Sequence, residues 1–179
     1  MQRDKEQIED ETLTIRAIRG QAEALDRLLS RWQKRIWNYQ YGLCRDEQAA
    51  WDLLQETCLS VARGIQSLKD PTSFAPWMFR LAHRRYVDWV RKDARNGEAK
   101  ARVAEEMETN QPNGTDGLGR IRAAIEQLDP DHRAVITLTY VQGFSYDEIA
   151  GALELPVGTV KSRIHYAKQK IRELIEKES

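Results

Sequence analysis

The stretch that decides the fold is GFSYDEIAGALELPVGTVKSRIHYAKQKIR, residues 143–172. Ser145 and Glu148 stand three apart, as in a helix capping box. The helix that they begin is interrupted at 154–156, and a second helix is expected from about 157 to 175. Two short helices joined by a tight turn, the second of them basic, predict a helix-turn-helix.

The last helix has two faces of different chemistry. Apolar residues at spacings of three and four predict its buried seam: Val160, Ile164, Ala167, Ile171 and Leu174. Residues 157–172 hold five bases and no acid. The residues that point away from this seam are Lys161, Ser162, His165, Lys168 and Gln169. Long donors on such a helix suit base edges and phosphates, which predicts duplex DNA as the partner. The alternative is an ordinary solvated basic face.

Further helices are expected on either side of a polar linker. Before the motif, 118–128 and 130–142 are helical in pattern, with Asp129 as N-cap and Gly143 just past the end. Apolar residues at helical spacing also predict helices at 21–43, 46–66 and 74–95. We therefore predict an all-α fold with two small helical domains joined by a flexible linker. Its expected divisions are an N-terminal tail or first helix at 1–20, a first module at 21–96, an acidic linker at 97–118 and a second module at 119–179.

Charge is separated along the chain, although the 179 residues carry no net charge. Residues 80–95 hold six bases and two acids, and 157–172 hold bases alone. Residues 1–11 and 96–117 each hold two bases and five acids. Because phosphates respond to the local field, a neutral total does not argue against nucleic acid.

Composition also limits the class of protein. The mean hydropathy is −0.67, and the chain lacks an apolar run of membrane-spanning length or a secretory signal, so we expect a cytoplasmic location without membrane insertion. Cys44 and Cys58 are interpreted as reduced thiols, with a redox switch as the alternative. Neither they nor the three histidines show zinc-site spacing. We predict no metal, no cofactor and no catalytic residues.

Residues 143–172, and the run 158–163 above all, resemble region 4 of extracytoplasmic-function (ECF) sigma factors of the sigma-70 type. The resemblance implies that this module reads the −35 promoter element in the major groove. The implied DNA-binding residues are Thr159, Lys161, Ser162, Arg163, His165, Tyr166 and Lys168. His165 and Tyr166 depart from the usual residues at their positions, so the −35 sequence does not carry over.

The run from Asp52 to Glu56 resembles the region 2.2 motif of the same family. The resemblance implies that Asp52, Gln55 and Glu56 bind core RNA polymerase at the clamp helices of its β′ subunit. At spacings of three and four these side chains share one helix face and offer acceptors to a basic partner. The alternative is a solvated acidic surface.

Residues 73–92 resemble regions 2.3 and 2.4, which melt the −10 element and capture an unpaired base. The implied DNA-binding residues are Phe74, Trp77, Arg80, Arg84, Arg85, Trp89 and Arg91. Aromatic rings beside arginines suit single strands, because bases stack and backbones are anionic. Core packing is the equal alternative for Phe74 and Trp77. Arg84 stands where many family members have asparagine, which leaves the −10 preference open.

The resemblance implies a promoter-recognition subunit of RNA polymerase and not an enzyme. Its implied partners are core polymerase (the β′ clamp helices and the β flap), promoter DNA and an anti-sigma protein that wedges between the modules. The acidic linker would run through the RNA channel of the polymerase. Two rivals remain: a dimeric helix-turn-helix regulator that binds a palindrome without polymerase, and an enzyme acting on nucleic acid.

Overall fold

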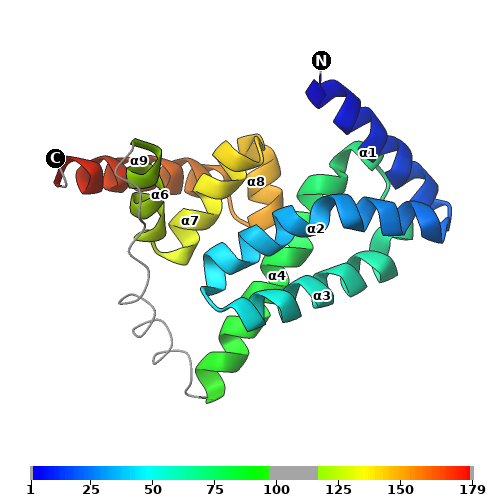
Figure 1. Cartoon of the computed structure of the whole chain (residues 1–179), viewed down its shortest axis with the longest axis horizontal. Helices are drawn as coiled ribbons and strands as arrows, with labels where there is room; N and C mark the ends of the chain where they lie inside the picture. The colour runs from blue at the N-terminus through cyan, green and yellow to red at the C-terminus, as the bar shows by residue number, and fades with distance from the viewer. Residues whose placement is uncertain (1, 97–116, 178–179) are drawn as a thin grey trace.

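The computed structural model describes residues 2–96 and 117–177, and every regular element in these ranges is helical (Figure 1). The first range contains α1 (Gln2–Ile18), α2 (Ala22–Cys44), α3 (Glu47–Gly64), the 3₁₀ turns η1 (Ile65–Ser67) and η2 (Pro71–Ser73), and α4 (Phe74–Asn96). The second contains α6 (Gly117–Glu126), α7 (Pro130–Ile136), the π-helical turn η3 (Thr137–Val141), α8 (Tyr146–Leu153) and α9 (Val157–Lys177). The predicted all-α class is confirmed. The predicted linker lies outside the described residues except for its last two residues, which begin α6.

The first module is a bundle of α2, α3 and α4 with α1 packed on its side (Figure 1). The apolar stripe predicted for 21–43 faces its core, where Leu28, Trp32 and Ile36 are buried. The α2–α3 connection is short because Arg45 takes a left-handed conformation (φ 56°) and Asp46 caps α3, its carboxylate accepting the Ala49 N–H at 2.9 Å. The two helices therefore form a hairpin that turns the acidic side of α3 outward.

The second module contains the helix-turn-helix, and its helix ends follow the predicted caps. Asp129 accepts the His132 N–H at 3.1 Å, with Pro130 in the first turn of α7. The Ser145–Glu148 capping box is complete at the start of α8. Glu154 ends α8 in a left-handed conformation (φ 56°), and α9 begins three residues later. The predicted helix-turn-helix is therefore present.

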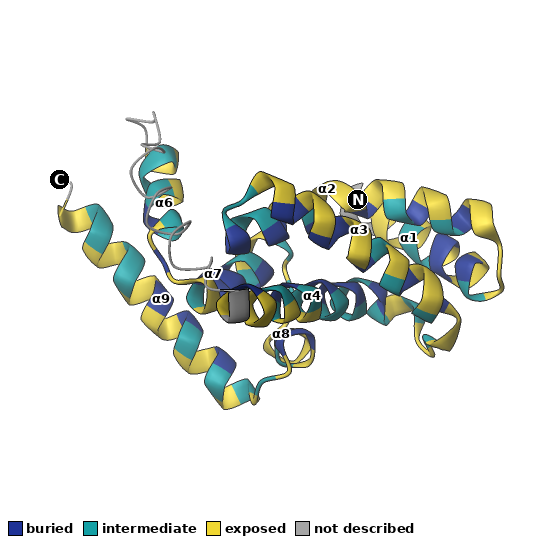
Figure 2. Cartoon of the chain, turned by 90° about the horizontal axis from the view of Figure 1, so that it is seen from below, coloured by how far each residue is buried: buried dark blue, intermediate teal, exposed yellow. Residues whose placement is uncertain are grey.

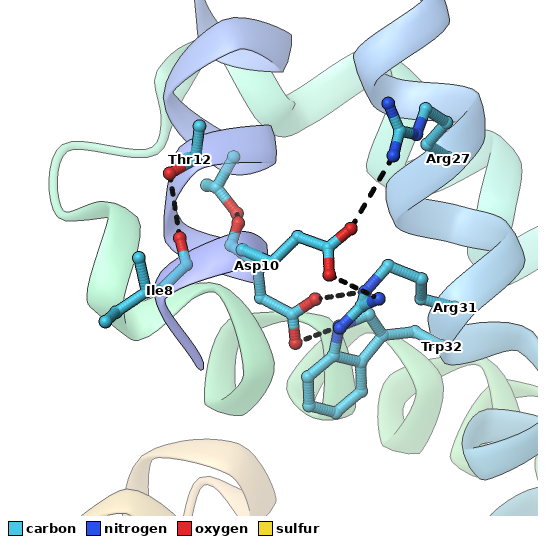
Figure 3. A network of polar contacts seen from close by, with 8 residues as sticks. Ile8, Asp10, Thr12, Arg27, Arg31 and Trp32 are labelled. Atoms are coloured by element: carbon cyan, nitrogen blue, oxygen red, sulfur yellow. Dashed lines mark hydrogen bonds and ion pairs between the residues drawn. The ribbon is translucent and has the colours of Figure 1, made fainter. Parts of the chain in front are cut away.

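A polar network fastens α1 to α2 (Figure 3). The Asp10 carboxylate accepts hydrogen bonds from Arg31 Nε at 2.6 Å and from Trp32 Nε1 at 3.1 Å. Glu9 accepts a further bond from Arg31 Nη1 at 3.0 Å. Below this network the apolar side of α1 is buried at Leu13 and Ala17. The acidic N-terminal segment is thus a packed helix whose carboxylates meet arginines of α2.

Replacing Asp10 by alanine should loosen α1. The change removes an acceptor from both Arg31 and the indole of Trp32, whose ring is buried. We expect the free energy of unfolding to fall by about 1–2 kcal/mol, a value reduced to allow for the partial exposure of the ion pair. Urea denaturation measures the change. Glu11→Ala, which removes only a bond to Gln7 on the same helix, is the matched control. Equal losses in the two variants would contradict the role given to Asp10.

The two modules pack against each other, with α8 on α4 and α7 on α2 (Figures 1 and 2). Phe144 meets Phe79 edge-on, their ring centroids 5.4 Å apart. Arg133 of α7 donates to the carbonyl oxygen of Gly42, and Arg45 Nη2 donates to that of Glu126 at 2.7 Å. One buried apolar cluster therefore contains residues of both modules. From the sequence alone we expected two separate cores.

Candidate nucleic-acid interface

The outer face of α3 carries the three residues predicted to bind polymerase. Asp52, Gln55 and Glu56 are all exposed, whereas Leu53 and Leu54 between them are buried. Gln48 Nε2 donates to Asp52 at 3.4 Å, which holds this carboxylate along the helix. The structure thus brings the three acceptors together on one accessible surface of α3.

Two large apolar side chains on this face were not found from the sequence. Trp51 is 52% exposed and Leu59 is 50% exposed, and both share the helical face of Gln55 at spacings of four. Trp51 lies 5.6 Å from Trp37 between ring centroids, and Trp37 stacks on Tyr41 at 5.0 Å. Exposed apolar side chains rimmed by polar residues are typical of a protein-binding surface. The sequence signal was the period of four from Trp51 to Leu59.

The aromatic side chains of 73–92 divide between core and surface. Phe74 is 3% exposed and packs edge-on against Trp32 at 6.1 Å, so the structure assigns it to the core and corrects its prediction as a DNA-contacting residue. Its position follows from the capped turn η2, which points the start of α4 inward. Trp77 is half-buried over α3, where a methyl group on Gly64 would lie 3.1 Å from Trp77 Cζ2. Trp89 is also half-buried.

Arg84 and Arg85 of α4 pair with acidic side chains. Arg84 donates from Nε to Glu154 Oε2 at 2.9 Å and from Nη2 to the other carboxylate oxygen. Arg85 lies 3.4 Å from Asp88. The bond to Arg84 lowers the pKa of Glu154, and the same bond raises the pKa of Arg84, so both groups stay charged. Arg91 is exposed, and Arg80 is partly buried.

On α9 the predicted seam and the predicted DNA face are separated as expected. Val160, Ile164 and Ala167 are buried, whereas Lys161, Ser162, His165, Tyr166 and Lys168 are exposed. Lys161 and Lys168 are seven residues apart and share one side of the helix. The hydrogen-bond donors of this group are exposed to solvent and can therefore contact bases in a major groove.

Arg163 differs from the other members of this group. Its Nη2 lies 2.8 Å from Asp131 Oδ2, and its side chain is only partly exposed. Tyr166 also has a partner within the module, His132, with 4.6 Å between ring centroids. The ion pair between α9 and α7 braces the recognition helix on its own module. We therefore place Arg163 among the residues that position the helix.

His83 lies where the two modules meet. Its Nδ1 is 3.0 Å from the hydroxyl of Tyr39, and the charges of Asp131, Arg163 and Glu154 of the second module act on its ring. Burial lowers the pKa of His83, and the positive charge of Arg163 acts in the same direction, against the two carboxylates. The neutral ring is therefore the form that fits this junction.

Lowering the pH should weaken the fold through His83. Because the pKa of the buried ring is depressed, the unfolded chain binds a proton there more readily, and the free energy of unfolding falls as the pH drops below about 6.5. Titration of this one group lowers the free energy of unfolding by no more than about 1.4 kcal/mol per pH unit. Urea denaturation at about pH 7.5 and about pH 5.5 measures it, with His83→Gln expected to flatten the dependence. The exposed His165→Gln variant is the control, and equal slopes in both variants would refute this assignment.

Among residues 2–96 and 117–177, no three metal-ligating side chains gather as a metal site would require. Over the same ranges, the helices fall short of the length and apolarity that crossing a bilayer demands.

Comparison with known proteins gives matches over both modules. Residues 28–96 match the family described as sigma-70 region 2, and residues 118–171 match the family described as sigma-70, region 4. RNA polymerase sigma factor CarQ of Myxococcus xanthus is 30% identical, with 87% of this chain and 91% of that protein covered. ECF RNA polymerase sigma factor SigE of Mycolicibacterium smegmatis is 32% identical over 86% of this chain, which spans 62% of that protein's length.

Solved structures with the same arrangement of helices include two complexes. CnrH, solved with the cytosolic domain of CnrY, is 26% identical with a TM-score of 0.69, and the alignment covers 96% of this chain and 99% of that one. The sigma factor RpoE of Bartonella quintana, solved with the anti-sigma factor NepR, has a TM-score of 0.67 over 84% of this chain and 96% of that one. At 22% identity the second likeness shows the fold alone.

Proposed function

The chain belongs to the extracytoplasmic-function subfamily of sigma-70-type RNA polymerase sigma factors, and we propose that it divides promoter recognition among three helices. It is a transcription initiation factor and not an enzyme. In the proposal α3 binds the β′ clamp helices of core polymerase, α4 holds the melted −10 strand and α9 reads the −35 duplex. The second module also meets the β flap, and the chain acts in the cytoplasm, where the polymerase works.

The observation that carries this division is the exposure of two chemically different faces. The face of α3 presents Asp52, Gln55 and Glu56 with the exposed aromatic Trp51 beside them, and exposed aromatic side chains are typical of protein-binding surfaces. The exposed face of α9 presents Lys161 and other long donors, as a helix that binds in the major groove does. Neither rival predicted from the sequence accounts for an acidic and apolar docking face on the same chain as a basic recognition helix.

Run-off transcription tests the proposed function. Core RNA polymerase together with this chain is expected to start transcripts at defined positions on a subset of a promoter library, whereas core polymerase alone should give none of these starts. Sequences upstream of the selected starts should share two short motifs separated by a spacer. Absence of any defined start, together with absence of core binding in a pull-down, would refute the proposal.

We further infer that an anti-sigma protein restrains this factor. The proposal is supported by the junction between the modules, where a hollow of about 270 Å³ is lined by α1, α2, the start of α4 and the segment from Val141 to Phe144. Glu6, Asp10, Glu11 and Glu148 contribute acids to its lining. A helix bearing basic and apolar side chains would suit this lining. Co-purification of the chain from its native cell should recover such a partner at equal stoichiometry, and recovery of polymerase subunits alone would count against it.

A further inference from the structure

The two flanks of the recognition helix α9 differ in the groups that they expose. Lys161 and Lys168 are exposed on one flank, and Tyr166, which lies between them along the helix axis, is exposed on the other. Lys170, one turn further on, lies beyond this stretch. A helix is about 10–12 Å wide and the major groove about 12 Å, so a bound helix has a phosphate backbone beside each flank. The lysines can serve one backbone, and the groups beside Tyr166 decide what the other backbone meets.

His132 of α7 lies beside Tyr166. The two ring centroids are 4.6 Å apart, and the ring planes are tilted by 40°. The Nδ1 atom of His132 is 2.6 Å from a carboxylate oxygen of Asp129. Because a carboxylate only accepts hydrogen bonds, Nδ1 carries a proton and is the donor in this bond. Among residues 2–96 and 117–177, neither Nε2 of His132 nor the hydroxyl of Tyr166 has a hydrogen-bond partner.

We propose that His132 and Tyr166 together bind one phosphate of the DNA backbone at the edge of the −35 duplex, with His132 in its protonated form. The phosphate accepts one bond from the Tyr166 hydroxyl and one from Nε2 of His132. The inference rests on the proposed function, since it takes α9 as the helix that enters the groove. It adds a DNA contact from α7, outside the helix-turn-helix, at a residue to which no sequence pattern pointed.

Protonation of His132 follows from its bond to Asp129. While Nδ1 donates to that carboxylate, a neutral imidazole has a bare Nε2 that can only accept. A phosphate oxygen also only accepts, so the two atoms cannot bond until Nε2 takes up a proton. The charged ring then lies between two anions, which favours its charged form. Duplex binding is therefore coupled to the uptake of a proton at His132, and the affinity falls as the pH rises.

The other charges around His132 already have partners. The charged and titratable groups beside it, or on the helices packed against α7, include Asp129, Asp131, Arg133, Arg163, Tyr166 and, from α2 and its end, Tyr39 and Arg45. Asp131 binds Arg163 Nη2 at 2.8 Å, and Arg133 donates to main-chain carbonyl oxygens. Asp129 is the acid bonded to the ring of His132. Because Arg163 neutralises Asp131, this acid repels an incoming phosphate only weakly.

The packing of α7 on α9 holds both donors in place. The Asp131–Arg163 ion pair and the His132–Tyr166 contact join neighbouring residues of α7 to residues three apart on α9. Each ring also has a partner that orients it, Asp129 for His132 and His132 for Tyr166. Donors that are already placed lose little conformational freedom on binding, so more of their interaction energy appears as affinity.

The pH dependence of duplex binding tests the proposal. The probe is a fluorescein-labelled duplex of about 20 base pairs and mixed sequence, bound to the full chain at low salt. Fluorescence anisotropy gives the affinity at about pH 6 and about pH 8, a range in which histidine side chains change charge. The reference chain is His165→Gln, which removes the histidine that is exposed on α9. We expect this reference to bind about tenfold more tightly at the lower pH.

Addition of His132→Phe to the reference chain separates the charge of His132 from its packing. Phenylalanine keeps an aromatic ring against Tyr166 but has no nitrogen. This chain should bind about equally well at the two pH values, with the affinity of the reference at about pH 8. His83 is present in both chains, so its titration cancels in the comparison. Tyr166→Phe, which removes only the hydroxyl, should weaken binding about threefold at both pH values.

Nuclear magnetic resonance gives a readout that packing alone would not change. The midpoint at which the Cε1–H resonance of His132 titrates should rise by about one pH unit when saturating duplex is added. Equal pH dependence with and without His132→Phe, or a midpoint that duplex leaves in place, would overturn the inference. Run-off transcription decides the proposed function separately. Defined starts with an unmoved midpoint would remove this contact alone, and a moved midpoint without defined starts would refute the promoter role while the DNA contact stands.

Discussion

A chain carrying both Asp52→Arg and Glu56→Arg should bind core RNA polymerase at least about 100-fold more weakly than the wild type. The two carboxylates are exposed one turn apart on α3, so the change replaces acceptors for a basic partner by two like charges. Like charges brought together in an interface cost several kcal/mol, and about 1.4 kcal/mol corresponds to a tenfold loss. Surface plasmon resonance with immobilised core polymerase measures the affinity.

The fold should tolerate this pair of changes, because neither side chain contacts the core. The matched control is Glu23→Arg with Asp26→Arg, which reverses two exposed acids at the start of α2 in the same module. We expect the control to bind polymerase within about threefold of the wild type, with circular dichroism unchanged in both variants. If both double variants lost affinity alike, general charge and not the α3 face would govern the interaction.

Removing Lys161 and Lys168 together should weaken binding of the −35 duplex about 100-fold. Both are exposed on one side of α9, where each can neutralise a phosphate or reach a base edge. Loss of two phosphate contacts should also reduce the slope of log affinity against log salt by about two. Fluorescence anisotropy of the sigma–polymerase complex on labelled promoter duplex, at several salt concentrations, gives both quantities.

Lys170→Ala with Lys177→Ala is the control for this prediction. These two lysines belong to the same helix but lie on its other flank, seven residues apart. The control should keep promoter affinity within about threefold and leave the salt slope nearly unchanged. A control that weakened binding as much as the Lys161 and Lys168 variant would show that α9 contributes only diffuse charge.

Local signals allowed most of the fold to be predicted from the sequence. Caps depend on residues within one turn of each other, and Asp46, Asp129 and Ser145 all begin helices in the structure. The seam of α9 was readable because burial repeats with the helical period. For residues 1–20 the sequence predicts either a tail or a first helix, because the contact that fastens this helix, Asp10 with Arg31, joins residues 21 apart.

The parts that could not be predicted depend on distant pairs. Arg84 and Glu154 are 70 residues apart, and Arg133 and Gly42 are 91 apart. Their meeting depends on how two modules pack, which no local pattern specifies. For the same reason the sequence could not tell which of Phe74 and Trp77 is buried, since both are aromatic and lie about one turn apart on α4. Only the placement of η2 and of Gly64 decides which ring is buried and which is partly open.

Site-specific crosslinking in the promoter complex tests most directly whether α4 and α9 contact different parts of one promoter. A photoreactive amino acid would replace Asp88 on α4 in one chain and Gln169 on α9 in another, both exposed beside the proposed contacts. With core polymerase bound, Asp88 should crosslink to the unpaired strand near −10 and Gln169 to duplex near −35, about 25 base pairs away. Crosslinks from both positions to the same few nucleotides, or to random DNA alone, would contradict the account.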